Sequence, residues 1–290
     1  MKLQLDTTIS FHRLIRSHKD DKVTNDFAEL VNQAQAVHAS TYTKKEFAFS
    51  LINDCCAFQA HLYTTKSFLE SYKWIHRYGY YRPRSRTRMC DMLAQFVFDK
   101  YGSELVSCDA QTKDRILAQR LFEYLRTIIL DLWERFDEGL YLPLDDRTKC
   151  PFAWIGPIEK GRVFKMDIRS SVYRCNGSEG CTLKNMLKGK AEKRRAIKLL
   201  NALRIIPDAH PRKTSQLKKI EEFLEEFFEN GLESTCYEKC NSGIGDLIIA
   251  LETLADRTLV TTNAQEYEII CPAISQDYRI LPMQGSAHVV

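Results

Sequence analysis

Four polar residues stand at points where the sequence predicts that strands end or helices begin. Asp6 follows a short apolar run, and Glu46 opens an apolar helix. Asp246 follows two glycines at the head of another apolar helix, and Asn263 ends a β-branched run. In α/β proteins such junctions gather side chains at the carboxyl edge of a parallel sheet, where functional sites lie. Carboxylates gathered there repel one another, so they either take up a proton or hold a hard divalent cation.

The elements that would position these residues are predicted at both ends of the chain. Near the N-terminus we expect a strand at Leu3–Leu5, a polar helix to Ala34, a strand at Ala39–Tyr42 and a helix opened by Thr43–Glu46. Near the C-terminus we expect the helix that Asp246 heads, a strand at Thr258–Asn263, a helix from Ala264 and a strand at Tyr278–Leu281. The predicted fold class is therefore α/β.

The middle of the chain has a different pattern. Residues 61–140 are predicted to be mostly helical, with a buried face made by Ile116, Leu117, Leu121, Leu125, Ile128 and Leu132. Prolines and glycines interrupt residues 141–182, which predicts a small irregular or β subregion that contains cysteines and the strand-like run Arg162–Met166. Two further helices are expected at about 183–205 and 214–232.

Taken together, the four polar residues resemble the motifs of the PIN-domain nuclease family. Leu5–Thr8 stands where the family has its strand-ending Asp-Thr-Asn, and Tyr42–Phe47 stands at its second acid. Gly245–Ala250 looks like the third motif, and Val260–Asn263 is similar to the family's Val-Thr-x-Asp/Asn. The resemblance implies a PIN-like parallel sheet flanked by helices, built from residues 1–60 and 235–290, with residues 61–234 as a large, mainly helical insertion.

The same resemblance implies a catalytic set of Asp6, Glu46, Asp246 and Asn263, in which the three acids hold Mg²⁺ or Mn²⁺. Such a cation activates a water, orients a phosphate and stabilises charge on the leaving oxygen. Asn263 stands where the family more commonly has Asp, so one negative charge is missing and any second metal should bind more weakly. Thr7 and Thr261 are expected to hydrogen-bond the acids and orient them.

Helix capping is the simpler explanation for each of these residues taken alone. Asp and Asn are favoured at helix N-caps, and Thr43 with Glu46 fits a capping box. Asn263 with Glu266 fits nearly as well. The order of all four residues and their apolar flanks favour the metal site, and the two explanations are compatible because helix N-termini attract anions.

A basic and aromatic run is the candidate nucleic-acid contact. Residues 71–90 carry six Lys or Arg and no acid, and cations interleaved with rings suit single-stranded nucleic acid. The predicted contacts are Arg77, Arg82, Arg84, Arg86, Arg88, Tyr80 and Tyr81. A solvated loop with inward-packed tyrosines is the alternative. The second basic stretch, Lys188–Arg195, is predicted to be a solvated helix face, and an extension of a basic groove is the alternative.

The ten cysteines argue against a disulfide framework if the protein is cytoplasmic, as we expect. Two pairs on predicted turns, Cys175 with Cys181 and Cys236 with Cys240, are a low-ranking candidate zinc site. Structural zinc usually takes pairs separated by two to four residues, which the second pair fits and the first does not. Reduced structural cysteines are the preferred explanation, and Cys55 and Cys56 are predicted to lie in the core.

Composition sets outer limits on the function. The chain has 290 residues, of which 44% are hydrophobic and 28% charged, with a net charge of +4, as in a globular protein. Its strand-like start argues against a signal peptide, and no apolar run approaches the roughly 20 residues of a membrane span. Phosphate-binding glycine loops and serine-nucleophile motifs are absent from the sequence, so NTPase and serine-hydrolase functions lack support.

We therefore expect a metal-dependent endoribonuclease that cleaves single-stranded RNA, with toxin, RNA-processing and defence roles all open. The alternative is a catalytically weak PIN-like module that binds nucleic acid or a protein partner without cleavage. The preference for RNA over DNA comes from the resemblance alone. An inhibitor or antitoxin partner and the oligomeric state are also left open by the sequence.

Overall fold

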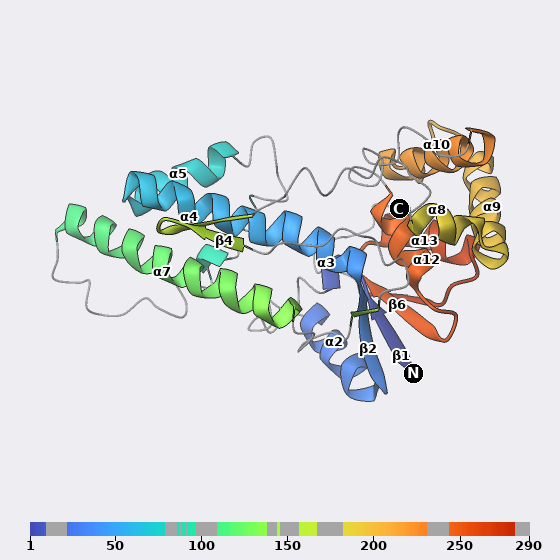
Figure 1. Cartoon of the computed structure of the whole chain (residues 1–290), viewed down its shortest axis with the longest axis horizontal. Coiled ribbons are helices and arrows are strands. Elements are labelled where there is room, and N and C mark those ends of the chain that lie inside the picture. The colour runs from blue at the N-terminus through green and yellow to red at the C-terminus, as the bar shows by residue number, and fades with distance from the viewer. Residues whose placement is uncertain are drawn as a thin grey trace.

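The computed structural model describes residues 1–9, 22–78, 86, 89–90, 92–94, 96, 109–137, 144–145, 157–166, 182–230 and 244–281. The fold is mixed α/β and mostly helical, with one parallel sheet (Figure 1). Within these residues no helix combines the length and the apolar character that crossing a membrane requires. The cytoplasmic location stays a prediction.

The sheet has five strands in the order β3-β2-β1-β6-β7, and every neighbouring pair is parallel. The strands are β1 (Lys2–Leu5), β2 (Ala36–Ser40), β3 (Leu144–Asp145), β6 (Arg257–Thr261) and β7 (Tyr278–Ile280). Parallel neighbours need crossover helices, which are α2 (Lys22–Gln33) between β1 and β2 and α13 (Ala264–Ala273) between β6 and β7. The register pairs Leu5 with both Ala39 and Val260. Asp6, Ser40 and Thr261 therefore follow at one edge of the sheet.

The helix after β2 begins earlier than the sequence predicts. The predicted strand Ala39–Tyr42 ends at Ser40, and α3 spans Thr41–Phe47. The reason is an N-cap, because the Ser40 hydroxyl accepts the backbone N–H of Thr43 at 3.0 Å. The predicted capping box that starts at Thr43 is therefore wrong, since that residue already lies inside the helix.

One hydrophobic core joins the sheet to a group of long helices. A π-helical turn, Ala48–Ile52, connects α3 to α4 (Asn53–Thr65), which packs against α5 (Phe68–Tyr78), α7 (Ala110–Asp137) and the hairpin of β4 (Pro157–Lys160) and β5 (Val163–Met166). The predicted apolar face of α7 is confirmed for Leu121, Leu125 and Leu132, which are buried. The predicted β subregion contains this hairpin, whose turn uses Gly161 at a φ of 68°.

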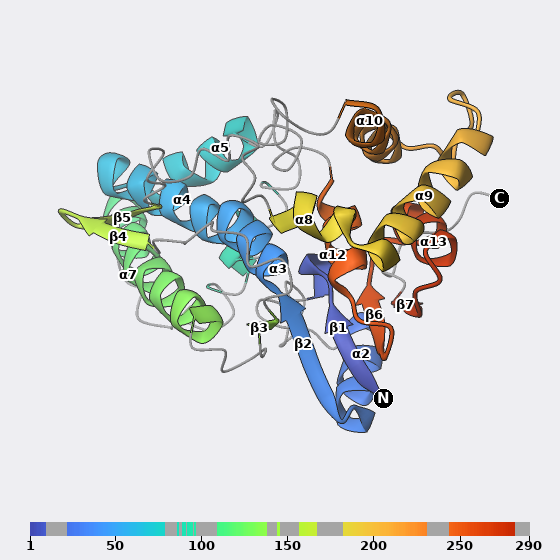
Figure 2. The same ribbon diagram turned by 45° about the vertical axis from the view of Figure 1, so that its right-hand side comes forward.

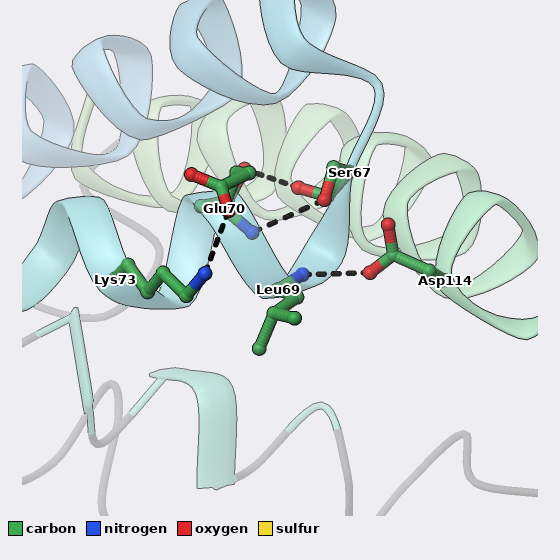
Figure 3. A network of polar contacts seen from close by, with 6 residues as sticks. Ser67, Leu69, Glu70, Lys73 and Asp114 are labelled. Atoms are coloured by element: carbon green, nitrogen blue, oxygen red, sulfur yellow. Dashed lines mark hydrogen bonds and ion pairs between the residues drawn. The ribbon is translucent and has the colours of Figure 1, made fainter. Parts of the chain in front are cut away.

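The N-terminus of α5 is fixed to α7 by polar contacts (Figure 3). Ser67 caps the helix by accepting the backbone N–H of Glu70 at 3.1 Å. The neighbouring N–H of Leu69 donates instead to Asp114 of α7 at 2.7 Å, while the Glu70 side chain pairs with Lys73 at 2.8 Å. A carboxylate from another helix thus satisfies an N–H that has no partner within its own helix.

A second core lies on the other side of the strands and contains the helices near the C-terminus (Figure 2). It is formed by α8 (Thr182–Lys188), α9 (Lys190–Ile205), α10 (Ser215–Asn230), α12 (Gly245–Glu252), α13 and β6. The single helix predicted at 183–205 is in fact two helices, which are separated at Gly189. The division of the chain into a PIN-like domain and an insertion at 61–234 stays a prediction.

Candidate active site

Asp6 is the most firmly held acid of the candidate site. It follows β1 and is only 2% exposed. Its Oδ2 accepts the hydroxyls of Thr8 and Thr261, each at 2.8 Å. Its Oδ1 accepts the backbone N–H of Thr7 at 2.6 Å and, at 3.4 Å, the hydroxyl of Tyr267. Burial raises the pKa of Asp6, and the hydrogen bonds oppose that rise.

Glu46 reaches the same place from α3. Its Oε2 accepts the hydroxyl of Thr7 at 2.5 Å, so Thr7 contacts both Asp6 and Glu46. Its Oε1 lies against Gly245, where an added Cβ would clash with this oxygen and come within 3.0 Å of Tyr42. A glycine at the first position of α12 therefore allows a carboxylate to approach the N-terminus of the helix, which is favourable for an anion.

Asp246 is the next residue of α12 and the acid whose charge is most disfavoured. Burial raises its pKa well above the ordinary value, and repulsion by Asp6, Glu46 and Glu266 adds to the rise. A hydrogen bond from Tyr267 opposes it. The three acids that the sequence predicts as metal ligands are therefore within electrostatic reach of one another, although they are far apart along the chain.

Glu266 is a fourth acid of this cluster that sequence reasoning assigned to helix capping instead. It lies in the first turn of α13, is 8% exposed and accepts the hydroxyl of Thr214 at 2.9 Å. Its position three residues after Asn263 is the signal that pointed to a cap. A second sequence feature could have pointed to the site. Glu266 lies one helical turn after the end of a predicted strand, at the carboxyl edge of the sheet where sites are expected.

Capping accounts for only part of the pattern. Asp6 accepts backbone N–H groups at the start of the segment that follows β1. Asn263 occupies the N-cap position of α13, but its side chain makes no capping hydrogen bond. The N-cap of α12 is Ile244, so Asp246 lies inside that helix. The backbone N–H of Asn263 donates at 2.9 Å to the hydroxyl of Thr261, which in turn donates to Asp6.

The chemistry of the donors fits a hard divalent cation. All the candidate ligand atoms are carboxylate oxygens, the type that Mg²⁺ and Mn²⁺ prefer, and the missing Cβ of Gly245 leaves room for one of them. Across the part of the chain that the structure describes, no three His, Cys, Asp or Glu side chains converge closely enough to hold a metal ion. Hydroxyl donors hold the carboxylates in place, and repulsion between like charges favours keeping the carboxylates apart.

The other predicted binding residues are only partly within the described chain. Arg77 and Arg86 are exposed, as nucleic-acid contacts require. The rest of the basic and aromatic run lies outside the described residues: Arg82, Arg84, Arg88, Tyr80 and Tyr81. The four candidate zinc ligands also lie outside them: Cys175, Cys181, Cys236 and Cys240. The roles of these residues stay predictions.

Two cysteines and one arginine from the sequence analysis have structural roles. Cys55 and Cys56 are buried in α4, as predicted, and burial raises the pKa of Cys56 to about 12. The basic stretch at Lys188–Arg195 is largely solvent-exposed, but Arg195 donates to the carbonyls of Ala250 and Leu251. This arginine therefore stabilises the C-terminus of α12.

Comparisons with known proteins give no family for the chain. No protein-family model, no curated protein and no solved structure matches it. Any function assigned to the chain therefore depends on the geometry and chemistry of the acid cluster.

The contact between Gly245 and Glu46 predicts an unusual response to alanine. Alanine in a helix is normally about 1 kcal/mol more favourable than glycine. Gly245→Ala should instead lower the free energy of unfolding by about 1–3 kcal/mol, because its Cβ displaces the Glu46 carboxylate. Urea unfolding measures this loss. In a Glu46→Ala background the loss should shrink, and an equal loss in both backgrounds would show that Glu46 is not the group displaced.

The raised pKa of Asp246 predicts a pH-dependent effect of neutralising it. The folded protein binds the proton of Asp246 more tightly than the unfolded chain does, so this residue's contribution to stability is lost as pH rises from about 4 through the raised pKa. In chelator, Asp246→Asn should therefore melt on the order of 3 °C or more above the parent near pH 8. Calorimetry should find the gap closing towards about pH 4. A gap independent of pH would contradict the shift.

Proposed function

We propose that the protein is a PIN-like, metal-dependent endoribonuclease that hydrolyses single-stranded RNA. The observation that supports this function is the cluster of Asp6, Glu46, Asp246 and Glu266 beside the carboxyl ends of β1 and β6. Carboxylates that are buried or partly buried and repel one another lower the stability of a fold. A set of four from separate elements is therefore better explained by a cation that they bind than by folding alone.

Asp6, Glu46 and Asp246 would hold Mg²⁺ or Mn²⁺, and Glu266 adds a further negative charge that acts on Asp246. When bound, the cation supplies Lewis acidity that activates water and neutralises charge on the leaving oxygen. Asn263 would contribute an amide at the end of β6, where a weaker second metal site is expected.

Hydroxyl groups would fix the directions in which these carboxylates point. Thr261 and Thr8 hold one oxygen of Asp6, and Thr7 holds one oxygen of Glu46. Donors outside a metal's ligand set orient the ligands and commonly affect affinity and activity by about 10–100-fold. The predicted roles of Thr7 and Thr261 follow from these contacts.

Substrate contacts would come from the basic and aromatic run at residues 71–90, which begins within α5. Arg77, at the end of α5, and Arg86 are exposed and available to phosphate groups. Cations beside tyrosines and a histidine suit a flexible single strand, because its phosphates and its bases are both accessible. The choice of RNA rests on the resemblance to PIN nucleases.

A PIN-like module that binds without cutting is the second candidate, and three observations favour it. The carboxylates do not converge as a metal site within the described residues. Asp6 already accepts hydrogen bonds on both oxygens, and Asn263 lacks the charge of the more common Asp. In that case nucleic acid would bind but remain intact.

Cleavage of labelled single-stranded RNA separates the two candidates. The parent protein should cut RNA with Mn²⁺ and not in chelator. Asp246→Asn should lower the rate by at least about a hundredfold while RNA binding persists, since only the reaction needs the metal's electrostatic stabilisation. The matched control is Asp256→Asn, which removes an exposed acid paired with Lys2. Binding without Mn²⁺-dependent cutting by the parent would favour the non-cleaving module.

A further inference from the structure

One face of α9 has a row of exposed cations that the proposed function does not use. Helical residues three or four positions apart lie on the same side, so a series of such spacings makes one continuous stripe. In α9 the exposed residues at these spacings, which we name the α9 stripe, are Lys190, Lys193, Arg194, Ile197, Lys198, Asn201, Arg204 and Ile205.

The charges of the α9 stripe are all of one sign. It contains five cations and no acid. Lys190, Arg194 and Lys198 follow one another at intervals of four residues, a spacing at which like charges repel and lower the stability of a helix. Arg204 pairs with Glu225 of α10 at 2.9 Å. The one acid of α9, Glu192, lies in the first turn, off the stripe, and is only partly exposed. A polyanion in contact with the stripe would offset this repulsion.

The opposite face of α9 fixes the stripe relative to two of the acids. Leu199 is buried in the core that also contains α12 and α13. Arg195 donates to the carbonyl of Ala250 at 3.2 Å and to the side chain of Gln276 at 3.0 Å. Ala250 lies four residues after Asp246, which is about 6 Å along α12. In Figure 1, α9 lies at the right-hand edge of the molecule, outside α12 and α13.

The composition of the α9 stripe favours nucleic acid over a membrane surface. Its apolar members are Ile197 and Ile205, which are 38% and 81% exposed. A helix that inserts among lipid headgroups needs a wide apolar face, and the apolar face of α9 is in the core. The cations recur about once per helical turn over about 12 Å from Lys190 to Lys198. A row of positive charge along a helix matches the repeating phosphates of a nucleic-acid backbone.

On the basis of the proposed nuclease function, we propose that the α9 stripe binds the phosphate backbone of the RNA substrate outside the acid cluster. Contacts to phosphates position a nucleic acid without reading its bases, so binding at this surface is independent of sequence. The bound strand is held against the same core as Asp246 and Glu266, which lie on α12 and α13. This surface is separate in sequence from the basic run at residues 71–90.

A triple variant, Lys190→Gln with Lys193→Gln and Lys198→Gln, tests the surface. Glutamine has nearly the helix propensity of lysine, and all three side chains are exposed, so the variant should fold. In chelator, its affinity for a labelled single-stranded RNA, measured by fluorescence anisotropy, should fall by more than about tenfold at about 50 mM salt. The slope of log K against log salt should become shallower by about two, since each phosphate contact on a single strand contributes about 0.7.

The matched control removes three exposed cations from the β4–β5 hairpin, through Lys160→Gln, Arg162→Gln and Lys165→Gln. It lowers the net charge equally and leaves the α9 stripe intact, so its RNA affinity should stay within about twofold of the parent's. Equal losses in the two variants, or an unchanged salt slope in the α9 variant, would overturn the proposal. Stripe-dependent binding of polyglutamate or of phosphatidylserine vesicles without binding of RNA would also overturn it.

Cleavage in Mn²⁺ separates this surface from the proposed function. The α9 variant should raise KM by more than it lowers kcat, because contacts outside the acid cluster are the same in the bound substrate and the transition state. If the parent binds RNA through the stripe but cuts none with Mn²⁺, the nuclease function fails and the surface stands. If the parent cuts RNA and the α9 variant keeps the parent's KM and salt slope, the surface fails and the nuclease function stands.

Discussion

Repulsion among the clustered carboxylates is the constraint on which the candidate active site depends. Asp246 carries the clearest sign of it, since burial and three neighbouring acids all raise its pKa. Hydroxyl donors reduce the cost without removing it, because each supplies one proton to a site with several negative charges. A cluster of this kind is less stable than an apolar or neutral one, and such a cost is characteristic of functional sites.

The register of the parallel strands and a close contact between α3 and α12 bring these acids together. Parallel pairing of β1 with β6 sets Asp6 beside Thr261, and the backbone N–H of Asp6 donates to the carbonyl of Val260 at 3.0 Å. The glycine at the start of α12 then admits Glu46 from α3. Residues of the two hydrophobic cores therefore meet at the acid cluster, because α3 belongs to the side of the first core and α12 to the second.

Much of this arrangement was predictable from the sequence, for identifiable reasons. The β-branched run before Asn263 and the apolar helix after Asp246 have strong patterns, so the strand and the helix were expected close to where they lie. The start of α3 was displaced because Ser40 caps the helix, and a single serine is a weak signal beside a β-branched stretch. The two-residue strand β3, which sets Asp145 beside Ser40, is too short to have a periodicity.

The roles of the side chains were less predictable than their positions. Glu266 fits a capping pattern equally well, and only its proximity to Asp246 in space separates the two explanations. Tyr267 has the sequence pattern of an ordinary core aromatic, and only the fold sets its hydroxyl 3.4 Å from Oδ1 of Asp6. The structure also leaves Asn263 without a direct hydrogen bond to an acid among the described residues.

Iron-directed backbone cleavage tests most directly whether one cation-binding pocket unites the distant acids. Fe²⁺ occupies oxygen-ligand sites of this type, and with ascorbate and peroxide it generates hydroxyl radicals that cut the nearby backbone. We expect cuts near Asp6, Glu46, Asp246 and Glu266 together, suppressed by excess Mn²⁺ and absent from Asp246→Asn. Cuts confined to one of these segments, or an unchanged pattern in Asp246→Asn, would contradict a shared cation site.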